Sequence, residues 1–435
     1  MKLKSLHEDF RVEELTSVRP SRGPFSFYRL EKRGIGTPEA ITAILRDWNL
    51  SRKAVDYGGL KDRHAVTVQY LTIHKGPNQS HEDRSYRLEY LGQLSAPYHA
   101  NDISANRFSI RLRNLKHEDR LDLDRRCEMV KEHGIVNYFD DQRFGSMGYS
   151  GELIAVPWCK GDYERALFLA MAEQNSHDRG REKEQKEIMR QHWGDWLLLK
   201  QKLDRSHRRS VVTYLVDHPT DFKRAVALIR QDMRSLYLSA FQSWVWNRWL
   251  SQLISDGIGS DNCITYESKC GSLSIPKPGA SLRSIDWLRN SDLPLPSARQ
   301  HDWDHSTLPT LDNILAGLGL ERREMRLKYP RDSFFSKGFR RTWISPANFE
   351  FGWVNDELHN QRLALDLSFD LPRGCYATMI VRAISSADWQ EDDGDNGEEM
   401  DDGNDELVSP EGDESQEGGA QQGGAKGDAT WRDES

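Results

Sequence analysis

The chain has 435 residues, which is enough for two or three compact domains. Its net charge of -8 is unevenly spread: residues 388–435 hold 18 acidic and 2 basic side chains (-16), which leaves 58 basic and 50 acidic side chains (+8) for residues 1–387. Five scattered cysteines without a Cys-x-x-Cys pair, no run of 18 apolar residues and the polar start MKLKSLHEDF argue against a zinc site, a membrane span and a signal peptide, and predict a cytoplasmic protein.

Strand and helix patterns alternate in the first 75 residues. FRVEEL (10–15) and FSFYRLEKRG (25–34) alternate apolar and polar residues, as half-buried strands do. TPEAITAILRDW (37–48) has apolar residues at helical spacing, and Thr37 before a proline predicts an N-cap. The paired glycines near the start of YGGLKDRHAVTVQYLTIH (57–74) predict a loop that leads into a further strand.

The middle of the chain changes character twice. Strand patterns continue to NRFSIRLRNL (106–115), and a helix is expected over 117–134. Residues 166–252 have the pattern of a helical region. Residues 253–344 are rich in proline, glycine and serine, and we expect them to be irregular.

Strand pattern returns at RLALDLSFDLP (362–372), close to the end of the basic body. We therefore expect an α+β fold in which one sheet is built from both ends of the body, with the middle inserted. Beyond residue 388 the chain is acidic and poor in apolar residues, so we expect this tail to be disordered. The basic body favours a polyanionic partner, although a solvated mixed-charge surface has the same composition.

Three segments carry residues suited to chemistry. In GLKDRHAVTVQ (59–69) a carboxylate, Asp62, lies among cations that favour its ionised form, in a glycine loop open to a ligand. NYFDDQRFG (137–145) combines an amide with aromatic rings, which suits an unstacked nucleotide. LPRGCYATMIVRAI (371–384) delivers Tyr376 after a turn. Taken singly, each segment has an ordinary structural interpretation: a solvated loop charge or helix cap for Asp62, and core residues for the other two.

In one chain and in this order, the segments resemble the motif set of the TruD family of tRNA pseudouridine synthases. EDFRVEE (8–14), GGLKDRHAVTVQ (58–69), NYFDDQRFG and RGCYATMIVRAI (373–384) carry the resemblance, and LSAFQSWVWN (238–247) is similar to a helix of the family's inserted domain. The resemblance covers about residues 1–387. It implies a pseudouridine synthase catalytic core with a mixed, largely antiparallel sheet, plus a family-specific inserted α/β domain.

The resemblance also implies domain limits and site residues. It places the catalytic domain in residues 1–165 and 345–388, the inserted RNA-binding domain in 166–344, and the disordered acidic tail in 389–435. Asp62 matches the family's catalytic aspartate. The residues expected to bind the substrate uridine or to lie beside Asp62 are Phe10, Asn137, Tyr376, Phe139 and Lys4.

The implied reaction is the isomerisation of uridine to pseudouridine in tRNA, at uridine 13 of the D arm, after the base has been flipped out. No cofactor or metal is expected, tRNA is the expected partner, and monomer is the default state. Asp62 would act as a nucleophile or would abstract a sugar proton to give a glycal. The basic clusters 205–209, 230–234 and 321–331 are candidate contacts to the tRNA backbone, although isolated basic runs of this kind are more often solvated faces.

Two other functions compete with this interpretation. A non-catalytic RNA-binding protein or RNA chaperone with the same fold would be favoured if the aspartate were missing, but Asp62 is present. A glycosidase or nucleoside hydrolase also places a carboxylate beside a glycosidic bond, yet it usually has a paired second acid, and no such acid stands out in the sequence.

Overall fold

A large mixed sheet is the frame of the molecule. The computed structural model describes residues 1–176, 178–277, 279–298, 305–327, 329–385 and 390–391. Eleven strands join in the sheet, whose main path runs β15-β16-β8-β2-β5-β3-β7-β6, with β1, β4 and β17 attached at its sides. The strands are β1 (Lys2–Leu3), β2 (Phe10–Thr16), β3 (Phe25–Arg33), β4 (Val55–Tyr57), β5 (Val66–His74), β6 (His81–Asp83), β7 (Tyr86–Leu94), β8 (Ile103–Leu115), β15 (Ala347–Asn355), β16 (Leu363–Leu371) and β17 (Gln390–Glu391).

The sheet joins the two ends of the body, as the sequence predicts. β16 pairs with β8, and β8 pairs with β2. Antiparallel pairs dominate; β2 and β5 run parallel, as do β1 and β17. The predicted strands over 10–15, 25–34, 106–115 and 362–372 are thus confirmed as β2, β3, β8 and β16.

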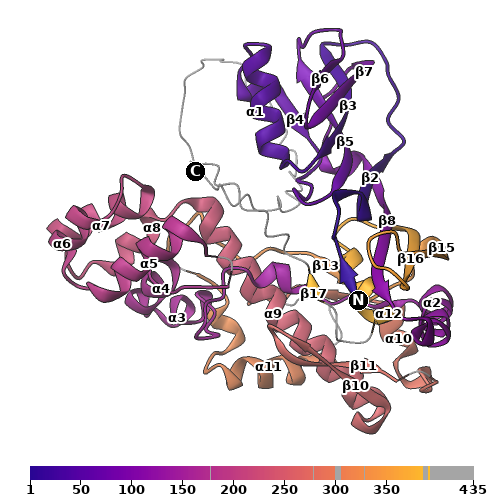
Figure 1. The fold of residues 1–435 in the computed structure, drawn as a ribbon. Coiled ribbons are helices and arrows are strands. Elements are labelled where there is room, and N and C mark those ends of the chain that lie inside the picture. The colour runs from indigo at the N-terminus through magenta and orange to yellow at the C-terminus, as the bar shows by residue number, and fades with distance from the viewer. Residues whose placement is uncertain (177, 278, 299–304, 328, 386–389, 392–435) are drawn as a thin grey trace, which may run out of the picture.

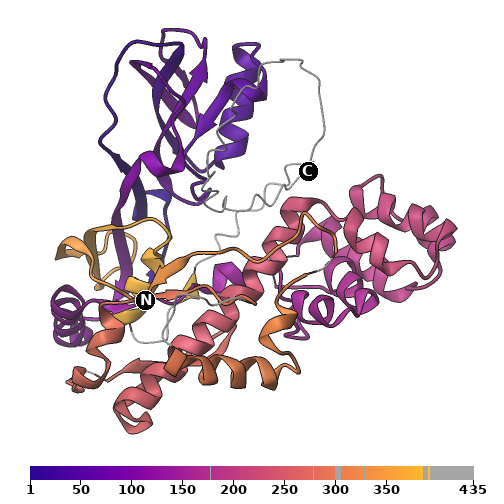
Figure 2. The ribbon, with the colours of Figure 1, turned by 180° about the vertical axis from the view of Figure 1, so that it is seen from behind.

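Helices cover the sheet at its two ends. α1 (Thr37–Asp47) packs Ile41 and Ile44 against Tyr28 and Leu71 of β3 and β5. At the other end, α2 (Arg120–His133) and α12 (Ala377–Ser385) pack together and contribute to the main core. α2 confirms the helix expected over 117–134. Figures 1 and 2 show the α1 end of the sheet standing apart from the end that carries α2 and α12.

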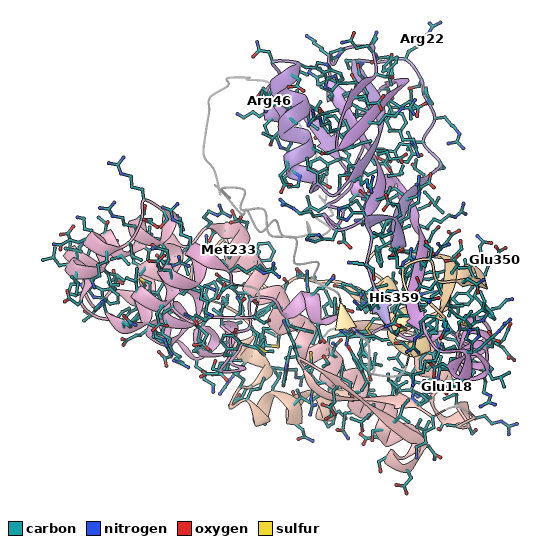
Figure 3. All side chains as sticks on the ribbon, in the orientation of Figure 1. Arg22, Arg46, Glu118, Met233, Glu350 and His359 are labelled. Carbon is teal, nitrogen blue, oxygen red and sulfur yellow. The ribbon has the colours of Figure 1, made fainter. Side chains whose placement is uncertain are left out.

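A helical arm extends from the other side of the molecule. The long helix α9 (Gln231–Ile258) runs from this arm to the sheet region, and its Trp246 and Trp249 are fully buried (Figure 1). Figure 3 labels Met233 near the start of α9 and Arg46 on α1, on the two separate arms. The arm's other helices are α3 (Ala155–Lys160), α4 (Tyr163–Met171), α5 (Gly180–Gln191), α6 (Trp196–Lys202), α7 (His207–Asp217) and α8 (Phe222–Leu228).

The segment 253–344 is more regular than its composition predicts. Part of its structure comes from packing on α9, which supplies an apolar surface for β11 and α11. The expectation of an irregular chain is therefore wrong for the elements that follow, and it is confirmed for stretches between them such as 329–338. Its elements are β10 (Cys263–Ser268), β11 (Gly271–Pro276), α10 (Asp286–Arg289), β12 (Asp292–Pro294), α11 (Leu308–Gly317), β13 (Phe339–Arg341) and β14 (Trp343–Ile344), the last paired with β9 (Ile135–Val136).

Two further expectations concern the ends of elements. The predicted N-cap at Thr37 is wrong, because the cap position of α1 is Gly36 and the Thr37 hydroxyl bonds elsewhere. The acidic tail over 389–435 lies outside the described residues, apart from 390–391.

None of the helices in the described part of the chain combines the length and the apolar character that a bilayer crossing requires.

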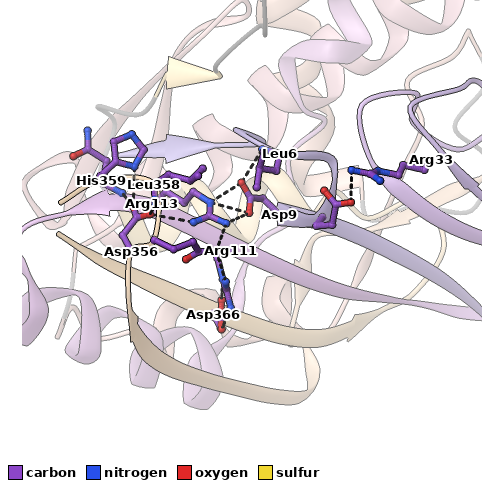
Figure 4. A network of polar contacts seen from close by, with 12 residues as sticks. Leu6, Asp9, Arg33, Arg111, Arg113, Asp356, Leu358, His359 and Asp366 are labelled. Carbon is purple, nitrogen blue, oxygen red and sulfur yellow. Dashed lines mark hydrogen bonds and ion pairs between the residues drawn. The ribbon is translucent and has the colours of Figure 1, made fainter. Parts of the chain in front are cut away.

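A buried arginine network fixes the start of β2 (Figure 4). The Arg113 Nε donates to both carboxylate oxygens of Asp9 at 2.8 Å, and its Nη1 donates to Asp356 at 3.0 Å. Burial alone would raise the pKa of Asp356, but hydrogen bonds from the backbone of Asn114 and Leu358 and from the side chains of His359 and Arg113 lower this pKa to about 2. Because Asp9 directly precedes Phe10, the network holds the backbone of Phe10.

Removing the Arg113 guanidinium should destabilise the protein strongly. The substitution Arg113→Met leaves Asp9 and Asp356 buried without their cation, at a cost of about 3–5 kcal/mol in the free energy of unfolding. Urea unfolding measures it. The matched control is Arg126→Met, which breaks a helical pair with Asp122 in which the Asp122 carboxylate is exposed and should cost about 0–1 kcal/mol. Equal losses for the two variants would contradict the role given to Arg113.

Candidate active site

Asp62 lies in the loop of residues 58–65, between β4 and β5. Its side chain is 46% exposed, and its Oδ2 is 3.4 Å from the Nζ of Lys4. The same ammonium group lies 4.4 Å from the centroid of the Phe10 ring, which is buried. Because an exposed ion pair contributes only about 0–1 kcal/mol to stability, the contact with Lys4 serves chiefly to orient the carboxylate. The structure thus brings Asp62, Lys4 and Phe10 together.

A buried lysine outside the recognised motifs anchors the backbone of the Asp62 loop. The Nζ of Lys32 donates to the backbone carbonyls of Lys61 (3.1 Å), Asp62 (2.8 Å) and Ile35 (2.8 Å). These three acceptors use all three N–H bonds of the ammonium group. Burial lowers the pKa of Lys32 to about 8, against the opposing charges of Asp62 and Glu39. Lys32 therefore ties the backbone of Asp62 to β3.

The neighbour of Asp62 anchors the loop a second time. The Nζ of Lys61 lies 3.1 Å from Glu14 Oε1 and donates to Asn106 Oδ1 at 2.7 Å. Burial raises the pKa of Glu14, and the charge of Lys61 opposes this. The backbone N–H of Lys61 donates to the hydroxyl of Thr37, which in turn donates to Gln69 Oε1. Thr37 thus serves the loop, and this explains why it does not cap α1.

Phe139 and Tyr376 form a second cluster, together with a residue that the sequence analysis missed. The Arg340 guanidinium lies 4.0 Å from the Phe139 ring centroid and 5.7 Å from that of Tyr376. The two rings lie edge to face at 6.5 Å. A cation over aromatic faces contributes about 0.5–2 kcal/mol. Arg340 comes from β13, in a segment without a recognised motif, so no sequence signal pointed to it.

Asn137 is occupied within this second cluster. Its Nδ2 donates to the carbonyl of Arg341 at 2.7 Å, and its Oδ1 accepts from Nη2 of Arg340 at 2.8 Å. The side chain is buried. In this structure Asn137 therefore orients Arg340, and an additional bond to a uracil edge would use the remaining hydrogen or lone pair of the amide.

The helix motif around Asn247 positions Phe139. Oδ1 of Asn247 accepts from the backbone N–H of Phe139 at 2.8 Å, and its Nδ2 donates to the carbonyl of the same residue at 2.9 Å. This bidentate contact satisfies both main-chain groups of Phe139 inside the core. Asn247 is the last residue of LSAFQSWVWN, so the motif supplies a positioning side chain.

The register of the sheet gives an indirect link between the two clusters. Asn106 of β8 faces Glu14 of β2 and Leu371 of β16, so the row that receives Lys61 is also the row where β16 ends. The turn after β16 accepts a hydrogen bond from Arg340 at Gly374 and leads to Tyr376. Among the described residues, no hydrogen bond, ion pair or ring contact joins Asp62 directly to the second cluster.

The basic clusters proposed to contact tRNA are largely paired within the protein. Arg208 pairs with Glu182, Arg234 donates to Asp332, and Arg322 lies 2.6 Å from Asp312. Such cations are already neutralised by neighbouring carboxylates, so these contacts favour the solvated-face interpretation of the three clusters. A 660 Å³ hollow beside Arg111 and Arg113 is lined by residues of their ion pairs, and Asp62 is not among its lining residues.

Comparisons with known proteins agree with this architecture. The family model described as tRNA pseudouridine synthase D (TruD) matches residues 1–275. The Methanococcus maripaludis protein named Probable tRNA pseudouridine synthase D 1 is 29% identical over 392 residues, covering 88% of this chain and 99% of the relative. The tRNA pseudouridine synthase D of Aquifex aeolicus is 24% identical over 402 residues, covering 89% and 99%.

A solved TruD structure from Methanosarcina mazei has the same fold. It matches with a TM-score of 0.68 at 21% identity, over 88% of this chain and 92% of the solved chain. The family model covers more than half of the 435 residues, and it includes the loop of Asp62 and the segment of Phe139. The chain therefore belongs to the TruD family of tRNA pseudouridine synthases.

Proposed function

We propose that this protein converts uridine 13 in the D arm of tRNA to pseudouridine, with Asp62 as the catalytic residue. The observation that carries the proposal is the double anchoring of Asp62: Lys4 contacts its partly exposed carboxylate, and Lys32 donates to its backbone carbonyl. A catalytic group has to be both accessible and held in one geometry, and Asp62 meets both conditions. The position of the uridine rests on family membership alone.

The reaction is an isomerisation and needs no net oxidant or reductant. The N1–C1' bond of the uridine breaks, the uracil turns, and C5 forms the new bond to C1'; C5 gives up its proton and N1 gains one. Asp62 would assist either as a nucleophile or as the base that removes a sugar proton to give a glycal. Both routes require an ionised carboxylate, and the ammonium group of Lys4 is the cation that contacts it.

The second cluster would hold the flipped base. Stacking on aromatic rings contributes about 1–3 kcal/mol per base, which offsets the cost of unstacking the target. Phe139 and Tyr376 are the proposed rings, with Arg340 as a cation beside them. Phe10, packed under Lys4, would support the carboxylate end of the site. Asn137 keeps its proposed contact with the uracil edge.

Loss of the Asn247 amide should lower activity through Phe139. In Asn247→Ala the buried N–H and carbonyl of Phe139 lose their partners, and a displacement of about 1 Å at a reacting site can cost 10²-fold in rate. We expect about 10- to 100-fold slower pseudouridine formation. The control is Gln252→Ala on the same helix, whose amide bonds the exposed Asp256 and which should keep its activity. A fully active Asn247→Ala enzyme would remove Phe139 from the proposed site.

Mapping of pseudouridine at nucleotide resolution tests the proposed target. RNA from cells with and without the protein should differ at uridine 13 of tRNA, and the purified protein should restore the modification. If RNA from cells without the protein lacked pseudouridine only at another position, that position would be the target instead of uridine 13. Free uracil in the purified reaction would favour a hydrolase, and RNA binding without either product would favour an RNA-binding protein.

We further propose that the protein is a monomer located in the cytoplasm. Its five cysteines are free thiols, which is consistent with that location.

A further inference from the structure

The two faces of β13 carry different side chains. Arg340 pairs with Leu293 of β12 and reaches the Phe139 ring on the inner face. Phe339 and Arg341 alternate with Arg340 and therefore lie on the outer face. The Phe339 side chain is 58% exposed and that of Arg341 is 71% exposed. One short strand thus links the candidate site to an exposed ring and an exposed cation.

The chain that leads into β13 is fixed although some of its side chains are exposed. Gln242 donates to the carbonyl of Ser336 at 2.8 Å, and the N–H of Leu295 donates to the carbonyl of Gly338 at 2.9 Å. Phe335 is buried against Phe241. Phe334 beside it is 63% exposed, and Lys337 is exposed as well. The exposed rings therefore project from a rigid backbone.

Exposing rigidly held phenylalanine rings is unfavourable in an isolated protein. Burying such a side chain gains about 1.5–3 kcal/mol, which an exposed ring forgoes. Single exposed apolar residues are common and need no explanation, but here Phe334, Lys337, Phe339 and Arg341 fall within eight residues. Aromatic rings interleaved with cations are the pattern of surfaces that bind single-stranded nucleic acid.

The charges on this strip are less neutralised than those of the other basic clusters. Arg341 has one carboxylate nearby, Asp292 at 3.6 Å, and both side chains are mostly exposed to solvent. Arg208, in contrast, is held against Glu182 and Arg234 against Asp332. Figure 1 shows β13 in the middle of the molecule, between the α1 end of the sheet and the helical arm.

We propose that Phe334, Lys337, Phe339 and Arg341 form a binding strip for unpaired nucleotides that flank the target uridine. The Phe339 ring stacks on the base next to the target, and the two cations contact phosphates. Phe334 precedes β13 by five residues and its ring is exposed, so it serves a more distant nucleotide than Phe339 does. The inference rests on the proposed function for the identity of the ligand as RNA.

Binding of RNA to single-site variants tests the strip. The measurements use full-length protein with Asp62→Asn, so that bound tRNA is not converted, and a labelled tRNA transcript as the probe. Phe339→Ala should weaken binding about 5- to 100-fold, Phe339→Trp should restore it, and Phe339→Leu should not, because leucine is apolar but cannot stack. The control is Leu197→Ala on α6, another exposed apolar side chain. Arg341→Gln should lower the dependence of binding on salt by about one counterion.

The outcomes separate this inference from the proposed function. The proposed RNA-binding strip would be wrong if Phe339→Ala bound tRNA within twofold of the Asp62→Asn parent, or if leucine and tryptophan at this position restored binding equally. The exposed rings would then be better explained as a contact surface for a protein partner. Pseudouridine formation by the unchanged protein is assayed separately. If the unchanged protein makes no pseudouridine while the ring series behaves as expected, the proposed function fails and the RNA strip stands.

Discussion

Asp62→Asn should lower the rate of pseudouridine formation by about 10⁴-fold or more. The amide is nearly isosteric with the carboxylate, so the loop keeps its anchors at Lys32 and Lys61, but it can neither attack C1' nor remove a proton. Loss of a catalytic carboxylate in other enzymes costs rates of this order. Single-turnover assays with excess enzyme and a tRNA transcript measure the effect, because they separate chemistry from product release.

Binding provides the control for this variant. Asp62→Asn should bind the tRNA transcript within several-fold of the unchanged protein, since it removes one negative charge and no stacking surface. Asp83→Asn, an exposed carboxylate on β6, should keep full activity. Turnover by Asp62→Asn within 100-fold of the unchanged protein would remove Asp62 from the chemistry.

Lys32→Met should give the second largest loss, about 10²-fold in kcat. The substitution leaves the carbonyls of Ile35, Lys61 and Asp62 without their donor, so the carboxylate of Asp62 is no longer held in one place. KM for tRNA should change much less, because Lys32 is buried and bonds backbone carbonyls rather than the rings proposed to hold the base. The matched control is Lys53→Met, an exposed lysine in the preceding turn, which should retain kcat.

The dependence on pH distinguishes this role from a purely structural one. The pKa of Lys32 is lowered by burial to about 8, while Asp62 and Glu39 raise it and Lys61 and Arg63 lower it further. Above pH 8 the amine loses its charge and one donor, so kcat of the unchanged protein should fall with an apparent pKa near 8. Lys32→Met should lack this step. A flat profile up to pH 9 in the unchanged protein would contradict the role.

The same group has the opposite effect on folding. Its pKa in the folded protein is lower than in the unfolded chain, so the unfolded chain binds more protons between about pH 8 and 10.5. From this group alone, the free energy of unfolding rises with pH over that window. A fall in kcat above pH 8 without a fall in stability therefore identifies loss of the loop anchor and excludes alkaline unfolding.

The sequence predicted the strands well because alternation and burial coincide along β2, β3 and β16. It failed at Thr37, where a proline in the first turn is typical of a capped helix but the hydroxyl bonds Lys61 and Gln69 instead. It also missed β11 and α11 within 253–344, where the surface of α9 organises a chain of weak local propensity. Long-range contacts of this kind have no local signal.

Site residues divide in the same way. Asp62 and Phe139 lie in motifs, whereas Arg340 comes from a segment without one and becomes visible only when β13 is placed beside Phe139. Lys32 did leave a signal, a charged residue at an inward position of an alternating strand, where lysine is almost never buried without partners. For the basic clusters the sequence left two interpretations open, RNA contact or a solvated face, because composition does not reveal that Arg208 and Arg234 are paired with carboxylates.

Release of tritium from a tRNA transcript labelled at C5 of uridine 13 tests the central proposal most directly. Because C5 loses its hydrogen when it forms the bond to C1', each conversion of uridine to pseudouridine must release one tritium label. We expect the unchanged protein to release the label from all of the substrate without free uracil, and Asp62→Asn to release none on the same timescale. Retention of the label by the unchanged protein, or its recovery in free uracil, would contradict the proposal.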